Sequence, residues 1–122
     1  MTRVVTFLMT LNPATALQFY RDTLGLTFLR DDSFALVFDM DGVTLRIAKA
    51  GQFTPAQHTV LGWEVDEIST TVDRLTSKGI AFEHYPNMGQ DEHAICTFPN
   101  GDRVAWFKDP DGNLLSISQH AH

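Results

Sequence analysis

The sequence contains a single cysteine, Cys96, among 122 residues. One thiol excludes an intramolecular disulfide, which fits a reducing compartment, and we interpret Cys96 as a small buried hydrophobic residue rather than a nucleophile. No apolar run approaches the ~18 residues that span a membrane, and the N-terminus lacks the basic and apolar regions of a secretory signal. We therefore expect a cytoplasmic protein with no membrane partner.

Basic residues are also few. Nine Lys and Arg stand against fifteen Asp and Glu, which gives a net charge of −6. The nine are scattered, with no stripe that would neutralise phosphates, so we expect no nucleic-acid partner. Acidity of this kind favours a neutral or cationic ligand, although its simpler role is solubility. With 43% hydrophobic residues, the chain is long enough for one core, and we predict a single domain over residues 1–122.

Several catalytic motifs are missing. The sequence has no G-x-S-x-G elbow, no glycine-rich phosphate loop and no cysteine next to a histidine. A serine and a histidine can still meet in three dimensions, which sequence spacing neither supports nor excludes.

The chain does contain an internal repeat. The strand-turn-strand pattern of Trp106–Leu115 echoes that of Phe38–Leu45, and each half reads as βαβββ. We predict module one at residues 1–50, a linker at 51–58 and module two at 59–122. The predicted elements of module one are strand 4–9, helix 13–24 and strands 26–29, 34–38 and 43–48. Those of module two are strand 60–65, helix 67–78 and three strand regions, at 80–83, at 93–98 with 103–107, and at 114–118.

Capping and turn residues support these elements. Asn12 is suited to cap the first helix with Pro13 at its first position, and Asp66 to cap the second; each helix ends at a glycine. Asp41-Gly42 and Asp111-Gly112 predict tight turns between antiparallel strands.

Two segments resemble a known superfamily. Phe19–Leu26 (FYRDTLGL) is similar to the helix-end signature of the vicinal oxygen chelate superfamily, and Asp109–Asn113 (DPDGN) to its last hairpin. That superfamily includes glyoxalase I, the bleomycin-resistance proteins and the extradiol dioxygenases. The resemblance covers nearly the whole chain and implies an α+β fold in which two βαβββ modules form curved mixed sheets around a cavity.

The resemblance also locates the positions where metal-using relatives carry His, Glu or Gln. Here they fall at Val5, at Leu45 or its neighbour Arg46, at Val60 and at Ser116. None is an ordinary ligand for a divalent ion, so we predict no metal site and no cofactor. Other residues that could bind a metal are expected to lie away from these positions. We expect His58 at the rim of the cavity, Asp91 and His93 in a solvated loop, and His120 and His122 in a frayed tail.

Strand alternation predicts a mainly apolar ligand site. The ligand-binding candidates are Val5, Phe7, Phe38, Arg46, Val60, Gly62, Glu64, Trp106 and Ser116. Trp63 is expected to turn away against the second helix. Glu64 is the most informative, because a carboxylate on this face either reaches solvent or meets a cation. Arg46 is one candidate for that cation, and it is equally suited to an anionic ligand.

Two functions remain. The first is a metal-free small-molecule binding protein similar to the bleomycin-resistance branch, holding a hydrophobic or cationic ligand in the half-barrel cavity of a homodimer, with no reaction catalysed. The second is an enzyme, a glyoxalase-like lyase, an isomerase or a dioxygenase, that uses a displaced metal or none. The substituted metal positions favour the first, and the resemblance implies the dimer.

Overall fold

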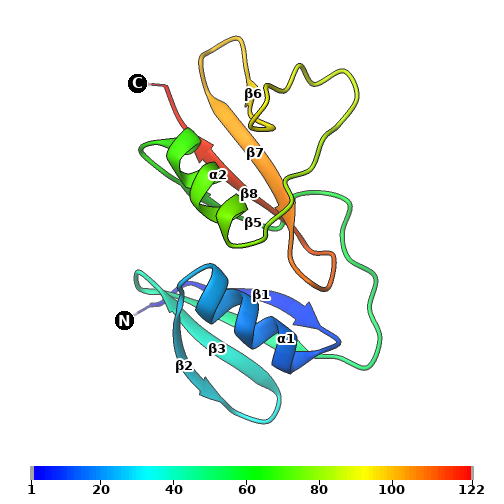
Figure 1. The fold of residues 1–122 in the computed structure, drawn as a ribbon. Helices are drawn as coiled ribbons and strands as arrows, with labels where there is room; N and C mark the ends of the chain where they lie inside the picture. The colour runs from blue at the N-terminus through cyan, green and yellow to red at the C-terminus, as the bar shows by residue number, and fades with distance from the viewer. Residues whose placement is uncertain (1, 122) are drawn as a thin grey trace. The chain divides into compact units, whose positions relative to one another are not determined.

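The computed structural model describes residues 2–121 and has an α+β fold with two four-stranded mixed sheets. The chain divides into two compact units. Unit 1 comprises the chain up to Pro55 together with Asp109–Gly112, and unit 2 comprises Ala56–Lys108 together with the chain from Asn113 on. Figure 1 shows one sheet and its helix in each unit.

Unit 1 contains the first sheet, with strands in the order β1-β4-β3-β2. Parallel pairing joins β1 to β4, and the other neighbours are antiparallel. The turn between β3 and β4 places Asp41 and Gly42 at φ 52° and 90°, the left-handed pair that a tight hairpin requires. The strands are β1 (Val5–Thr10), β2 (Thr27–Asp31), β3 (Ala35–Met40) and β4 (Val43–Lys49).

The predicted first helix forms in two parts, α1 (Pro13–Gln18) and the π-helical turn η1 (Phe19–Thr23). Its predicted cap is confirmed, because Asn12 Oδ1 accepts a hydrogen bond from the Thr15 amide at 3.3 Å. The wider last turn is marked by the bond from the Leu24 amide to the Phe19 carbonyl, at 2.9 Å. Gly25, at φ 77°, then turns the chain towards β2, which a residue with a side chain rarely does.

Unit 2 contains the second sheet, in the order β5-β8-β7-β6, with β5 parallel to β8. Its elements are β5 (Leu61–Glu64), α2 (Ile68–Ser77), β6 (Cys96–Thr97), β7 (Arg103–Lys108) and β8 (Leu114–Gln119). The prediction of a strand at 80–83 is wrong: this segment has no strand structure, although the Glu83 amide donates to the Trp106 carbonyl at 2.7 Å. The strand predicted at 93–98 shortens to β6.

The predicted cap of α2 is also wrong. The helix begins after Glu67, and the Ile68 amide donates to Gln119 Oε1 at 2.9 Å, so the cap comes from β8 rather than from Asp66. The buried side of α2 consists of Ile68, Val72 and Leu75, at the predicted helical spacing.

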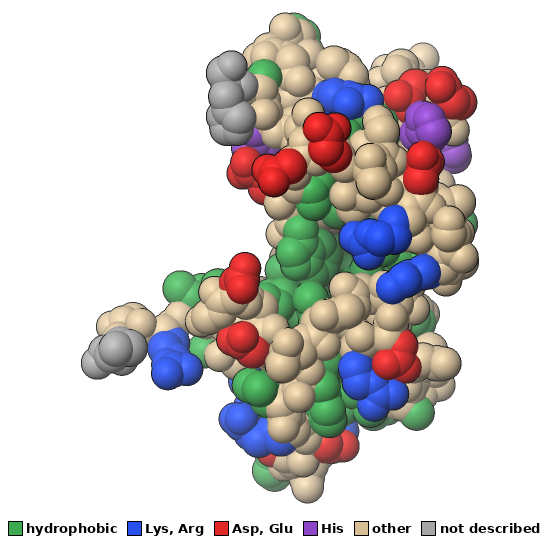
Figure 2. All heavy atoms as spheres, turned by 60° about the vertical axis from the view of Figure 1, so that its left-hand side comes forward, with side chains coloured by type: hydrophobic (Ala, Val, Ile, Leu, Met, Phe, Trp, Pro, Cys, Tyr) green, Lys and Arg blue, Asp and Glu red, His purple; other side chains and the backbone are tan. Residues whose placement is uncertain are grey.

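The surface mixes charge types. On the face shown in Figure 2, acidic, basic and apolar side chains are interspersed. Within residues 2–121, no helix is long and apolar enough to cross a membrane.

Candidate functional site

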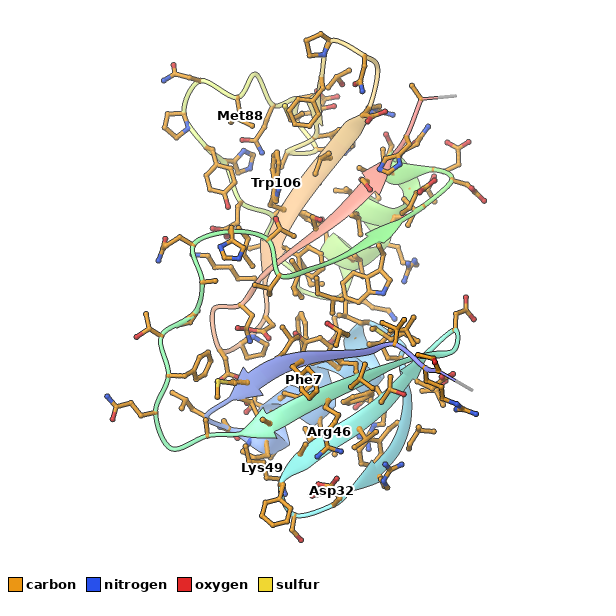
Figure 3. The ribbon with its side chains drawn as sticks, turned by 180° about the vertical axis from the view of Figure 1, so that it is seen from behind. Phe7, Asp32, Arg46, Lys49, Met88 and Trp106 are labelled. Carbon is orange, nitrogen blue, oxygen red and sulfur yellow. The ribbon has the colours of Figure 1, made fainter. Side chains whose placement is uncertain are left out.

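Within residues 2–121, one face of each sheet packs against the helix of its own unit (Figure 1). No described helix of the same unit covers the other face, which we call the helix-free face. In unit 1, Leu8 is buried on the α1 side, whereas its neighbours Phe7 and Met9 are 65% and 43% exposed. Residues paired across strands share a face, so Arg46, opposite Phe7, lies on the helix-free face too. Figure 3 shows Phe7 and Arg46 on this side of the sheet.

Arg46 pairs within its own unit. Its guanidinium donates to Asp32 Oδ2 at 2.9 Å, and this contact, together with the amides of Ala35 and Phe34, lowers the pKa of the Asp32 carboxyl. Asp32 lies in the turn between β2 and β3, beside Arg46 in Figure 3. The cation that we considered for Glu64 therefore has an acidic partner of its own.

Phe38 does not belong to the helix-free face, which corrects its place among the ligand-binding candidates. It is fully buried on the α1 side, with its ring centroid 6.0 Å from that of Tyr20 and 5.4 Å from that of Phe28. The alternation of apolar and polar residues could not show which way Phe38 points, because Ala35–Phe38 are all buried. Where the side chains on both faces of a strand are buried, both are apolar, and the alternation no longer distinguishes one face from the other.

In unit 2, three of the candidates form one row across the helix-free face. Gly62, Ser116 and Trp106 are opposite one another on β5, β8 and β7. The strands approach closely here, because a Cβ at Gly62 would lie 2.6 Å from Ser116 Oγ. Trp106 packs edge-on against Tyr85, with ring centroids 5.6 Å apart, and burial together with Glu83 raises the pKa of the Tyr85 phenol. Val60 precedes this row, and its amide bonds to the Leu114 carbonyl at 2.9 Å.

Glu64 lies one pair further along the same face, opposite Ser118. Its carboxylate Oε1 is 3.3 Å from His120 Nδ1, and His120 Nε2 is 3.2 Å from Ser118 Oγ. The prediction of a frayed tail is wrong for His120, because the next amide, that of Ala121, donates to Asp102 Oδ1 at 2.9 Å. His122 lies outside the described residues.

The loop cluster around His93 is a separate feature of unit 2. Asp91 Oδ1 accepts bonds from the amides of His93 and Ile95, both at 2.9 Å, and so shapes the turn. The His93 ring contacts Asp73 at 3.0 Å beside a cleft of about 420 Å³ next to α2.

The positions that hold metal ligands in similar proteins have no suitable donor set here. Val5 and Val60 have no lone pair to offer, Leu45 is fully buried in the core, and Arg46 is paired with Asp32; Ser116 alone is a weak ligand. Within residues 2–121, no three His, Cys, Asp or Glu side chains are grouped in a way that suits a metal ion. The residues present do not fit the metal of that superfamily.

The two signature segments meet inside unit 1. The Tyr20 hydroxyl donates to Asp109 Oδ2 at 2.6 Å, and both residues are buried. Asp111 accepts bonds from the Thr10 hydroxyl at 2.5 Å and the Leu11 amide at 2.8 Å. Burial and the neighbouring Asp109 carboxylate strongly raise the pKa of the Tyr20 phenol. These segments therefore hold the fold together rather than forming the site.

A family model for the Glyoxalase/Bleomycin resistance protein/Dioxygenase superfamily matches residues 3–117. The chain belongs to this superfamily. A curated relative, the uncharacterized protein YraH of Bacillus subtilis, is 26% identical, and the match covers 84% of this chain and 85% of that protein.

Several solved structures share the fold. A member from Sphaerobacter thermophilus has a TM-score of 0.77 at 18% identity, covering 98% of each chain. Lactoylglutathione lyase from Agrobacterium tumefaciens has a TM-score of 0.73 at 20% identity, covering 97% of this chain and 92% of that one. TioX from Micromonospora has a TM-score of 0.74 at 15% identity, covering 99% and 100%. At these identities the similarity concerns the fold.

Proposed function

We propose that this protein binds a small hydrophobic or cationic molecule without a metal ion, as a homodimer, on the helix-free face of its sheets. The observation that carries the proposal is the Gly62, Ser116 and Trp106 row of unit 2, with Glu64 next to it on β5. An aromatic surface beside a half-exposed carboxylate suits an aromatic amine, because the ring stacks while the carboxylate attracts the charge.

The substituted metal positions support binding without the superfamily's metal chemistry. The resemblance places divalent-ion ligands at four positions, which hold Val5, Val60, Ser116 and either Leu45 or the paired Arg46. In unit 1, the exposed Val5 and Phe7 add apolar surface to the helix-free face, which is the kind of lining that binds hydrophobic ligands. No cofactor enters this proposal.

The test compares a cationic with a neutral probe of the same shape, naphthylmethylamine and naphthylmethanol, by fluorescence titration. Glu64→Gln keeps the side-chain shape and removes the charge. We expect the amine to bind about ten- to hundredfold more weakly to the variant, which is the value of a charge-assisted contact, and the alcohol to bind unchanged.

Glu67→Gln provides the matched control, since Glu67 is exposed at the start of α2, away from the row. It should leave the affinity for both probes unchanged. Equal amine affinity before and after Glu64→Gln would remove Glu64 from the site.

The alternative is a superfamily enzyme that uses a displaced metal. Elemental analysis of protein purified without chelator separates the two functions. We expect less than stoichiometric divalent metal, and one bound ion per chain that survives dialysis would overturn the metal-free proposal.

A further inference from the structure

Three polar side chains of unit 2 form a chain of contacts on the helix-free face. Glu64 and Ser118 are opposite each other on the parallel strands β5 and β8, so their side chains share this face. His120 follows two residues after Ser118. Its ring bridges the two, with Nε2 3.2 Å from Ser118 Oγ and Nδ1 3.3 Å from Glu64 Oε1.

The chemistry open to these three side chains depends on which nitrogen of the His120 ring faces each partner. An ionised carboxylate only accepts hydrogen bonds, so Glu64 favours the tautomer of His120 that carries its proton on Nδ1. The lone pair of Nε2 is then available to the Ser118 hydroxyl. This is the order of roles in a serine nucleophile, a histidine base and an orienting acid.

Backbone contacts hold the members in place. The Ser118 carbonyl accepts a bond from the Val65 amide at 2.7 Å, directly after Glu64. On the other side of His120, the Ala121 amide is bonded to Asp102 at 2.9 Å. The residues before and after His120 in the sequence, Ser118 and Ala121, are thus both held by hydrogen bonds.

We propose that Ser118, His120 and Glu64 form a nucleophilic triad that hydrolyses activated esters. Ser118 Oγ attacks the ester carbonyl carbon and its proton passes to His120 Nε2. The new carbon–oxygen bond replaces the bond to the leaving alcohol, which takes that proton. Water then attacks the acyl group, giving a proton to His120 that returns to Ser118 Oγ as the acid is released. Glu64 acts as a positioning residue.

The solvent exposure of the His120 and Glu64 side chains indicates which esters can react. The side chains of His120 and Glu64 are 46% and 55% exposed, so esters reach the triad from solvent, where a good leaving group such as a phenol is needed. Val104 lies opposite Ser118 on the same face, with Trp106 two residues further along β7. They offer apolar surface to a short acyl or aryl group.

A fluorophosphonate probe tests the nucleophile directly. Ser118 Oγ would bond to phosphorus, fluoride would leave, and the proton would pass through His120 to solvent. We expect one adduct per chain by intact mass, assigned to Ser118 by peptide mapping, together with turnover of p-nitrophenyl acetate. Ser118→Ala should abolish both, whereas Ser77→Ala, an exposed serine at the end of α2, should change neither.

His120→Ala tests the base, and it also serves if Ser118→Ala fails to fold. We expect labelling about a hundredfold slower, with recovery on adding imidazole. Glu64→Gln should slow labelling, because it removes the acceptor charge that orients the imidazole, and Glu64→Asp should restore part of the rate. No adduct on the wild-type protein, an adduct on another residue, or a rate unchanged by His120→Ala would overturn the proposal.

This activity does not depend on the proposed ligand. Labelling reads the reactivity of Ser118, and the naphthyl probes read affinity beside Trp106. Because both proposals use the Glu64 carboxylate, Glu64→Gln affects both measurements. Ser118→Ala and His120→Ala keep that carboxylate, so their effect on labelling tests the hydrolytic activity separately from ligand binding.

Discussion

The hydroxyl of Tyr20 pairs with a buried carboxylate in the core of unit 1. It is fully buried, its ring packs edge-on against Phe19, and its hydroxyl is bonded to the buried carboxylate of Asp109. A hydrogen bond to a buried charge is worth more than an ordinary one. The residue is thus both a packing element and the partner that Asp109 needs away from water.

Tyr20→Phe tests this contact with the ring retained. We expect the free energy of unfolding to fall by about 1.5–3 kcal/mol, measured by urea denaturation. Tyr85→Phe is the matched control, because Tyr85 is only partly buried beside Trp106, and should cost well under 1 kcal/mol, about the value of a surface change. Equal losses in the two variants would contradict the role of Asp109.

The dependence of stability on alkaline pH provides a second test of the role of Tyr20. The pKa of Tyr20 is raised in the folded state, so its stabilisation is complete below the unfolded pKa of about 10 and declines as pH rises above it. There, stability should fall by about 1.4 kcal/mol per pH unit more steeply in the wild type than in Tyr20→Phe. Parallel curves of unfolding free energy against pH would contradict this.

At the scale of elements, the start of α2 depends on a distant strand. Gln119 Oε1 accepts from the Ile68 amide, 51 residues away in sequence. We predict that Gln119→Ala lowers the free energy of unfolding by about 1 kcal/mol, the usual cost of losing a cap. Gln119→Glu keeps the acceptor and adds a charge that suits a helix N-terminus, so it should retain wild-type stability in the same urea titration. Loss in both variants would show that this oxygen is not the cap.

Local patterns and long-range contacts account for what the sequence could and could not predict. Asn12-Pro13 and the glycine turns act over a few residues, so the first cap and most strands were predicted. The cap from Gln119 and the anchor of His120 on Asp102 depend on contacts between distant segments. The sequence pattern contains no sign of them. Phe38 was misplaced because a strand buried on both faces loses its alternation.

At the scale of the whole molecule, β1 exposes an apolar row. Val5, Phe7 and Met9 are 41%, 65% and 43% exposed on the helix-free face of unit 1. Adjacent apolar side chains of this kind commonly mark an interface, which is consistent with the proposed two-fold dimer.

Sedimentation at micromolar concentration should therefore give about twice the chain mass of 13.7 kDa. Phe7→Glu should shift the equilibrium towards the monomer, because a charge would be buried at the interface. Phe34→Glu is the matched control, since Phe34 is 77% exposed outside β1, and should leave the mass unchanged. A wild-type protein that sediments only as a monomer would contradict the dimer.

The turn Asp109–Gly112 belongs to unit 1, although the rest of that unit ends at Pro55. The bonds from Tyr20 to Asp109 and from Thr10 to Asp111 span 89 and 101 residues. At roughly 5–20 residues per second on the ribosome, the Tyr20 and Thr10 side chains wait about 5–20 s for these partners. During that time the Tyr20 hydroxyl lacks the Asp109 carboxylate and the Thr10 hydroxyl lacks the Asp111 carboxylate. Unit 1 therefore completes these hydrogen bonds only after most of unit 2 has been synthesised.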